Sequence, residues 1–259
     1  MDQARGARVW AAVSESARRD SAAVSLRHVV IACAQQLSGT GAGFSAVSGQ
    51  VLREPVLASG PAAEDLEELQ FTLGQGPGMD AVAVRGPVLA TDLAAPEAHR
   101  QWPAFAPAAA GLGMRGMFAF PVAVGAALIG VLDVYRPQPG PLDAEELAQG
   151  LVFADVALVL ALDKRIGIGV DGVADAAANT RTAHVHQATG MVAAQLNVSM
   201  PDALAILRAR AYARGQRLPD LAADVLARRV RLDPGPLGAD HAREDGTDPP
   251  YDRQEEEET

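Results

Sequence analysis

Two side chains in the C-terminal third of the chain have the types and the spacing for contact with RNA. Arg208 and Tyr212 are four residues apart, so on a helix both lie on the same side. An arginine can clamp a phosphate while an exposed aromatic ring stacks on an unpaired loop base, which is how sequence-specific RNA binding usually works. The pair predicts RNA contact, although the same pattern is also typical of an ordinary solvated helix face.

Five further side chains of the same region are candidates for RNA contact. They are Arg210, Arg214, Arg217, Thr189 and His186. Arg228, Arg229 and Arg231 follow in the chain, but these three could simply complement the negative end of a helix dipole. His184 and His186 are only two residues apart, so on a helix they occupy different faces and form a poor metal pair.

The basic side chains form an island in an acidic protein. The 259 residues have a net charge of −10, yet residues 175–232 hold eight basic and four acidic side chains. Salt screens charges beyond roughly 10 Å, so such an island can still attract RNA at close range. Residues 233–259 hold two basic and ten acidic side chains and are predicted to be a disordered tail. One hypothesis is that this tail competes with RNA for the island.

Three short amphipathic helices are expected to position the basic side chains in a small bundle. Apolar residues between positions 185 and 226 recur at spacings of three and four, Ser199 suits the N-cap of the second helix, and Gly215 suits its end. A glycine inside a helix costs about 1 kcal/mol relative to alanine, so Gly190 predicts either a close approach by another helix or a helix backbone that lies close to RNA. The predicted core residues are Ala188, Gly190, Ala203, Leu207, Ala211, Leu218 and Ala222.

The first part of the chain is predicted to be an α+β domain with an antiparallel sheet. Its clearest strands are residues 114–124 and 127–135, joined by a turn at Gly125. Strands joined by hairpins, with helices on one face, give this class of fold. The glycine-rich segment 73–79 is predicted to be a tight turn, and residues 100–105 a loop. Helices are expected at 7–19, 24–37, 64–71 and 143–164, and further strands at 43–47, 55–59 and 87–91.

Three aromatic residues are candidates for a ligand pocket in this domain: Trp102, Phe105 and Phe120. Trp102 and Phe105 could instead anchor their loop in the core. Cys33 is expected to be buried in a helix rather than reactive. Because it is the single cysteine, a disulfide within the chain and a cysteine-rich zinc site are excluded. No metal site and no cofactor are evident from the sequence.

Motifs of catalysis and of membrane insertion are absent from the sequence. It contains no G-x-S-x-G, no H-E-x-x-H and no P-loop, so we do not expect an enzyme. No run of about 18 apolar residues predicts a membrane span, and the N-terminus lacks a signal-peptide pattern. We therefore expect a cytoplasmic protein. The longest apolar stretch, residues 151–162, is interrupted by Asp155 and is expected to be a buried helix or a dimer interface.

Residues 179–232 resemble an ANTAR domain, the three-helix RNA-binding module of bacterial transcription antiterminators. Thr189 departs from the family, which often has a basic residue at that position. The resemblance implies binding to tandem RNA hairpins in a leader transcript, read-through of a terminator, and a homodimer, since two hairpins require two modules. The matching residues are Ala188 and Gly190 in the first helix, Ala203, Leu207 and Ala211 in the second, and Leu218 and Ala222 in the third.

Residues 21–165 resemble a GAF domain of the divergent type that often precedes ANTAR. In this organisation residues 1–20 form a separate N-terminal helix, and residues 166–178 form a linker. The GAF domain would sense a signal or dimerise, and so control RNA binding by the bundle. The alternative is a small-molecule-binding or dimerisation module with a helical interaction domain and no RNA binding. The matching residues are Leu73-Gly74-Gln75-Gly76-Pro77, Trp102-Pro103-x-Phe105, Phe120-Pro121 and Gly130-Val131-Leu132-Asp133.

Overall fold

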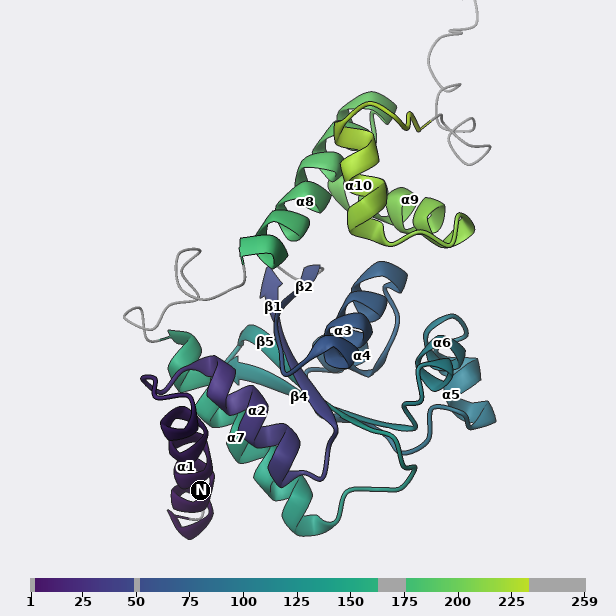
Figure 1. The fold of residues 1–259 in the computed structure, drawn as a ribbon. Coiled ribbons are helices and arrows are strands. Elements are labelled where there is room, and N and C mark those ends of the chain that lie inside the picture. Colours follow the sequence, from purple (N-terminus) through teal and green to yellow (C-terminus); the bar gives the residue numbers. More distant parts are fainter. Residues whose placement is uncertain (1–2, 49–51, 163–175, 233–259) are drawn as a thin grey trace, which may run out of the picture.

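The computed structural model describes residues 3–48, 52–162 and 176–232 (Figure 1). Most of the expected linker and the whole acidic tail lie outside the described residues. The N-terminal elements are α1 (Gln3–Arg19), α2 (Leu26–Gln36), β1 (Gly41–Ser48), β2 (Leu52–Ala58), α3 (Pro61–Leu73), α4 (Pro77–Val84), β3 (Val88–Ala90), α5 (Pro96–Gln101), α6 (Phe105–Gly111), β4 (Gly116–Val124), β5 (Ala127–Arg136) and α7 (Ala144–Leu162). The C-terminal elements are α8 (Ala176–Leu196), α9 (Met200–Ala213) and α10 (Leu218–Leu226).

An antiparallel five-stranded sheet with the order β2-β1-β5-β4-β3 forms the centre of the N-terminal domain. The predicted α+β class is therefore confirmed. The predicted hairpin joins β4 to β5, and Gly125 in its turn has a φ of +56°. Glycine adopts this left-handed conformation without the clash that a Cβ would cause, which suits it to a tight hairpin turn.

Helices cover both faces of the sheet, so the prediction of helices on one face is wrong. α2 and α7 pack on one face with α1 against both of them, and α3 to α6 belong to the other face (Figure 1). The physical reason is visible in β5, where residues 130–135 are buried at successive positions. Since neighbouring side chains of a strand point to opposite faces, burial of all of them requires cover on both sides.

Two segments predicted to be irregular contain short helices. α4 begins within the glycine-rich segment, and α5 and α6 flank Trp102 in the segment predicted to be a loop. Pro77 and Pro96 stand in the first turns of α4 and α5, where the missing backbone N–H costs no hydrogen bond. Proline therefore begins these helices instead of preventing them.

α8, α9 and α10 form the three-helix bundle around an apolar core. The backbone N–H of Asp202 donates to the hydroxyl of Ser199 over 3.3 Å, which confirms the predicted N-cap of α9. Gly215 follows α9 with a φ of +58°, a left-handed conformation that ends the helix. Six of the residues expected in the core are fully buried, namely Ala188, Ala203, Leu207, Ala211, Leu218 and Ala222.

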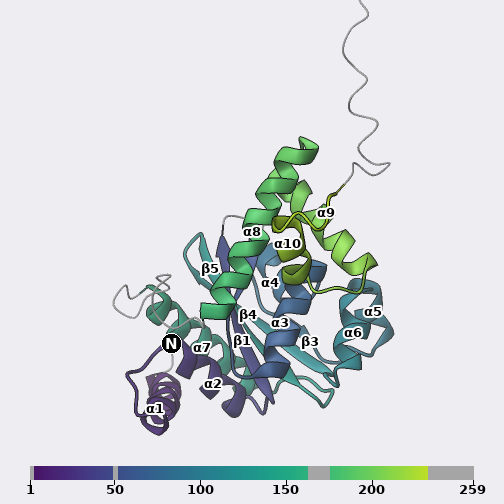
Figure 2. The same cartoon turned by 45° about the horizontal axis from the view of Figure 1, so that its top comes forward.

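The bundle rests against α3 of the N-terminal domain (Figures 1 and 2). Phe71 of α3 is only 3% exposed and belongs to the apolar cluster of the bundle. A side chain of one domain therefore completes the core of the other. Within the described ranges no single helix is long and apolar enough to span a membrane; α8 and α9 have the required length and composition only together, and they are bent by 106°.

Candidate nucleic-acid interface

The arginines of α9 lie on two different flanks of the helix. Arg210 and Arg214 are exposed and four residues apart, so they share one flank, which we call the open flank. Arg208 and Tyr212 share the other flank, which we call the seam flank because it faces α3. Guanidinium groups on the open flank can reach the phosphates of an RNA without any rearrangement of the protein.

Arg208 on the seam flank is half-buried between the two domains. Its guanidinium carbon lies 5.3 Å from the centroid of the Phe71 ring, a distance typical of a cation–π contact. Nε and Nη2 of Arg208 are buried without a hydrogen-bond partner among the residues that the structure describes. Burial lowers the pKa of Arg208, because the charged form loses hydration. Arg208 is therefore withdrawn from the surface on which RNA contact was expected.

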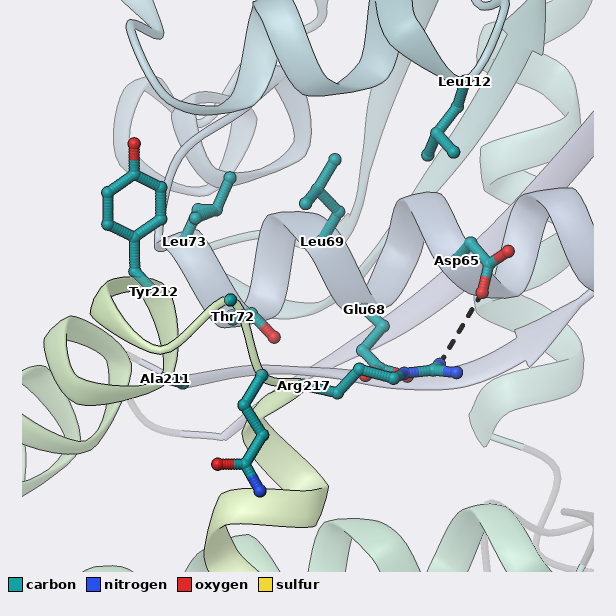
Figure 3. Close-up of a pocket in the computed structure, with 11 residues that line it drawn as sticks. Asp65, Glu68, Leu69, Thr72, Leu73, Leu112, Ala211, Tyr212 and Arg217 are labelled. Atoms are coloured by element: carbon teal, nitrogen blue, oxygen red, sulfur yellow. Dashed lines mark hydrogen bonds and ion pairs between the residues drawn. The ribbon is translucent and has the colours of Figure 1, made fainter.

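Arg217 precedes α10 and pairs with acidic side chains of α3. Its Nε donates to Oε1 of Glu68 over 2.6 Å, and its Nη2 donates to Oε2 of the same carboxylate. Asp65 lies 3.6 Å from Nη2 (Figure 3). The hydrogen bonds to Glu68 raise the pKa of Arg217. Two of the predicted RNA-contact arginines are thus held by α3.

A cavity of about 380 Å³ lies in this seam between α3 and the turn from α9 to α10. In Figure 3, Leu69 and Leu73 from α3 and Tyr212 from α9 line it, and Arg217 with its acidic partners forms the charged part. Tyr212 is 64% exposed. A volume of this size suits a small ligand, and it exists only where the two domains meet.

Thr189 and Gly190 have the reverse of the positions expected from the sequence. Thr189, expected to contact RNA, is 4% exposed, and its hydroxyl donates to the carbonyl of Val185 over 2.7 Å. Gly190, expected in the core, is half-buried, and a Cβ added there would meet no heavy atom within 4 Å. Both residues adjoin the buried stripe of α8, so the apolar spacing alone does not fix which of the two turns inward, and the structure places Thr189 there. Thr189 is therefore turned inward in this structure and its contact with RNA stays a prediction, whereas Gly190 is open to an approaching molecule.

The remaining basic candidates have mixed surroundings. His186 is half-buried on α8, and its contact with RNA stays a prediction. Arg229 forms an ion pair with Asp224 of α10 at 2.7 Å. This pairing agrees with a structural role for Arg229 at the C-terminal end of the helix. Arg228 and Arg231 are exposed.

Comparison with protein families assigns each of the two domains to a family. A family model described as a GAF domain matches residues 24–160, and a model described as an ANTAR domain matches residues 174–226. The chain is a GAF–ANTAR protein. GAF domains are sensory domains and ANTAR domains are RNA-binding antitermination domains. No curated protein sequence matches the chain.

Solved structures similar to this GAF–ANTAR protein cover its GAF domain. The GAF domain of a phosphoenolpyruvate-protein phosphotransferase from Coxiella burnetii is 15% identical, with 62% of this chain and 96% of that chain covered and a TM-score of 0.45. The corresponding domain from Acinetobacter is 12% identical, with coverages of 59% and 92% and a TM-score of 0.45. Free methionine-R-sulfoxide reductase from Neisseria meningitidis is 18% identical, with coverages of 52% and 74% and a TM-score of 0.40. Similarity at this level says nothing about activity.

The aromatic residues expected to line a GAF pocket do not lie together. Trp102 and Phe105 are buried in the core under α5 and α6, and the indole N–H of Trp102 donates to Asp80 over 3.1 Å. Phe120 belongs to the core on the opposite face, where a Cβ added at Gly150 of α7 would collide with its ring. The pocket that combines all three residues is therefore wrong, because alternation along β4 directs Phe120 away from the other two.

The GAF domain contains a buried polar network that the sequence pattern did not reveal. The hydroxyls of Ser45 and Tyr135 donate to the carboxylate of Glu67. The amide of Gln70 donates to Asp133 over 3.0 Å and accepts from a backbone N–H in α4. Glu67 and Gln70 are three residues apart on the inner side of α3, which is the signal that could have identified them. The network ties α3 firmly to the sheet.

Metal chemistry and thiol chemistry find no support in the described part of the GAF–ANTAR protein. No group of three or more histidine, cysteine, aspartate or glutamate side chains there has the arrangement to hold a metal ion. Cys33 is fully buried, and its burial raises the pKa of the thiol, which keeps it protonated and unreactive.

Proposed function

We propose that this GAF–ANTAR protein binds RNA through its helical bundle and acts by transcription antitermination. The observation that carries the proposal is the open flank of α9, where Arg210 and Arg214 project into solvent from an ANTAR domain. Surface guanidinium groups bind phosphates in bidentate geometry and stack on exposed bases. The protein would be a regulator rather than an enzyme, and it would act in the cytoplasm, where transcription takes place.

The proposed target is a pair of tandem hairpins in a leader transcript, and the proposed active form is a homodimer that supplies one bundle for each hairpin. Exposed apolar side chains on α1 and α7, which pack against each other, support dimerisation. These side chains are Trp10, Leu151, Val159 and Leu162, each between 44% and 62% exposed. The GAF domain would then sense a signal, dimerise the protein, or do both.

A second candidate function is a ligand-binding or dimerisation module that does not bind RNA. The cavity beside Tyr212 favours a ligand, and the apolar surface of α7 favours a partner chain. On this view the basic side chains of α9 would serve only solubility.

The two candidates are separated by titrating the full chain with fluorescent tandem-hairpin leader RNA at several salt concentrations. We expect tighter binding to the hairpins than to unrelated RNA of equal length, and weaker binding as salt rises, because each phosphate contact releases counterions. Equal affinity for both RNAs would contradict specific recognition. No binding to either RNA would support the second candidate.

The role of the open flank is tested by Arg214→Ala, with Arg27→Ala as the matched control on α2. Both arginines are exposed, so each substitution removes one surface charge. Arg214→Ala should weaken hairpin binding about three- to tenfold and reduce the salt slope by about one. Arg27→Ala should change neither quantity. Equal effects of the two substitutions would attribute binding to overall charge and contradict an interface on α9.

A further inference from the structure

Helix α3 offers the bundle the same kinds of group that RNA offers. Its outer side carries the carboxylates of Asp65 and Glu68, which carry negative charge as phosphates do, and the ring of Phe71, which presents an aromatic face as a base does. We propose that α3 is an internal competitor of RNA. It occupies Arg208 and Arg217 while the two domains are in contact, and RNA binds with full affinity only when they separate. This inference rests on the proposed function.

Arg208 has a site on α3 that is shaped for it. Its guanidinium lies over Phe71 and beside Gly74, at the C-terminal end of α3, where the helix dipole attracts a cation. A Cβ added at Gly74 would lie 3.1 Å from Nη1 of Arg208, and Gly74 has a φ of +63°. Glycine thus both ends α3 and leaves room for the arginine. A side chain held in this site is unavailable to a phosphate.

The site nevertheless leaves part of Arg208 unsatisfied. Nε and Nη2 lack hydrogen-bond partners within the described ranges, so stacking and charge hold the side chain without these hydrogen bonds. Buried donors without acceptors are unfavourable. An RNA phosphate would supply acceptors to both groups in bidentate geometry. RNA therefore binds the separated domains more tightly than the docked domains. This difference in affinity is what allows a ligand to shift the equilibrium between docked and separated domains.

Arg217 forms the second attachment, and this one is readily reversible. Its side chain is 51% exposed and that of Glu68 is 16% exposed, so the ion pair remains in contact with water. Ion pairs of this kind are weak and are screened by salt. The seam is therefore held by the apolar contact of Phe71, the stacked Arg208 and the partly exposed ion pair of Arg217, and a polyanion can compete for the two arginines.

The test compares Glu68→Arg with Glu64→Arg in the full chain. Both substitutions change the charge of α3 by the same amount; Glu68 pairs with the bundle, whereas Glu64 is an exposed residue one turn earlier. The rate at which phenylglyoxal modifies Arg208 is followed by mass spectrometry, and affinity for tandem-hairpin RNA is measured in parallel. Glu68→Arg should raise both about fivefold or more. Glu64→Arg should leave the modification rate unchanged and raise the affinity less than twofold.

Phe71→Leu provides a second route to release, because it keeps an apolar side chain but removes the aromatic face, and it should also speed modification of Arg208. Equal modification of Arg208 in the wild type, Glu68→Arg and Phe71→Leu would overturn the inference. Faster modification with an RNA affinity no higher than that of Glu64→Arg would also overturn it. If Arg208 becomes accessible and every variant binds hairpin and unrelated RNA alike, the proposed function fails, and competition with RNA fails with it.

Discussion

Two neighbouring glutamates show how differently the two sides of α3 behave. Glu67 is fully buried against the sheet, where the hydroxyls of Ser45 and Tyr135 donate to its carboxylate. Glu68 faces the bundle and pairs with Arg217, itself half exposed to water. The inner side of α3 therefore belongs to a network within one domain, and the outer side belongs to a contact between two domains.

The inner side of α3 should therefore determine the stability of the GAF domain, and the outer side should determine its contact with the bundle. A buried, hydrogen-bonded carboxylate cannot be removed without leaving its donors unsatisfied, which is costly. A partly exposed ion pair contributes little to the free energy of unfolding. Substitutions on the inner side should therefore lower the stability of the GAF domain, whereas substitutions on the outer side should alter the contact with the bundle and leave the stability of the fold nearly unchanged.

Glu67→Ala should produce the largest effect. It removes the acceptor of two buried hydroxyls, so the free energy of unfolding should fall by about 2–5 kcal/mol. Urea denaturation followed by circular dichroism measures this change. The control is Glu64→Ala on the exposed side of α3, which should change stability by less than about 0.5 kcal/mol. Similar urea midpoints for the two variants would refute the distinction between the sides.

Gly74→Ala should affect both sides at once. The left-handed conformation at this position costs a residue with a Cβ about 1–2 kcal/mol, and the added Cβ also presses on Arg208. We expect lower stability together with faster modification of Arg208. Gly111→Ala in α6, where an added Cβ meets nothing within 4 Å, should not lower stability and should leave the modification of Arg208 unchanged. Loss of stability without greater accessibility of Arg208 would show that Gly74 is needed only to end α3 and not to accommodate Arg208.

Glu68→Gln should have a smaller effect on stability, roughly 0–1 kcal/mol, because the ion pair that it removes is partly exposed. It should nevertheless speed modification of Arg208, and added salt should reduce the difference from the wild type, since salt screens the pair in the wild type as well. A loss of stability as large as that of Glu67→Ala would mean that both sides of α3 are structural.

Acid titration of an ion pair inside the GAF domain should produce the smallest change in stability. It compares an ion pair within one domain with the pair that joins α3 to the bundle. The hydrogen bonds from Arg115 lower the pKa of Asp92 to about 2, below its ordinary value of 3.8. A lowered pKa means that this stabilisation is present above pH 3.8 and is lost as the pH falls towards 2. Asp92→Asn should lower stability at neutral pH and flatten this part of the pH profile. Identical profiles for the wild type and Asp92→Asn would contradict the assignment.

Much of the architecture followed from local patterns in the sequence. The N-cap at Ser199, the helix end at Gly215 and the hairpin turn at Gly125 each depend on the chemistry of one residue and its nearest neighbours. Helical spacing likewise placed the apolar residues of the bundle correctly, because tertiary packing buries a stripe that periodicity already defines.

The candidate site was less accessible to the same reasoning. Periodicity cannot fix the rotation of a helix to within one residue, which is why Thr189 and Gly190 were exchanged. The fate of Arg208 depends on Phe71, more than a hundred residues earlier in the chain, and no local pattern encodes that contact. The burial of Glu67 and Gln70 was missed for a different reason: their spacing of three places them on one side of α3, but polar residues in a helix rich in acidic side chains look exposed.

The separation of α3 from α9 during an RNA titration tests the competition most directly. Glu64→Cys and Ala213→Cys place donor and acceptor dyes at two exposed positions, and fully buried Cys33 does not compete for labelling. We predict that energy transfer falls as tandem-hairpin RNA is added, with a midpoint at the Kd of that RNA, and that it stays constant with unrelated RNA. Unchanged energy transfer at saturating hairpin RNA would show that RNA binds with α3 in place, and would contradict the account.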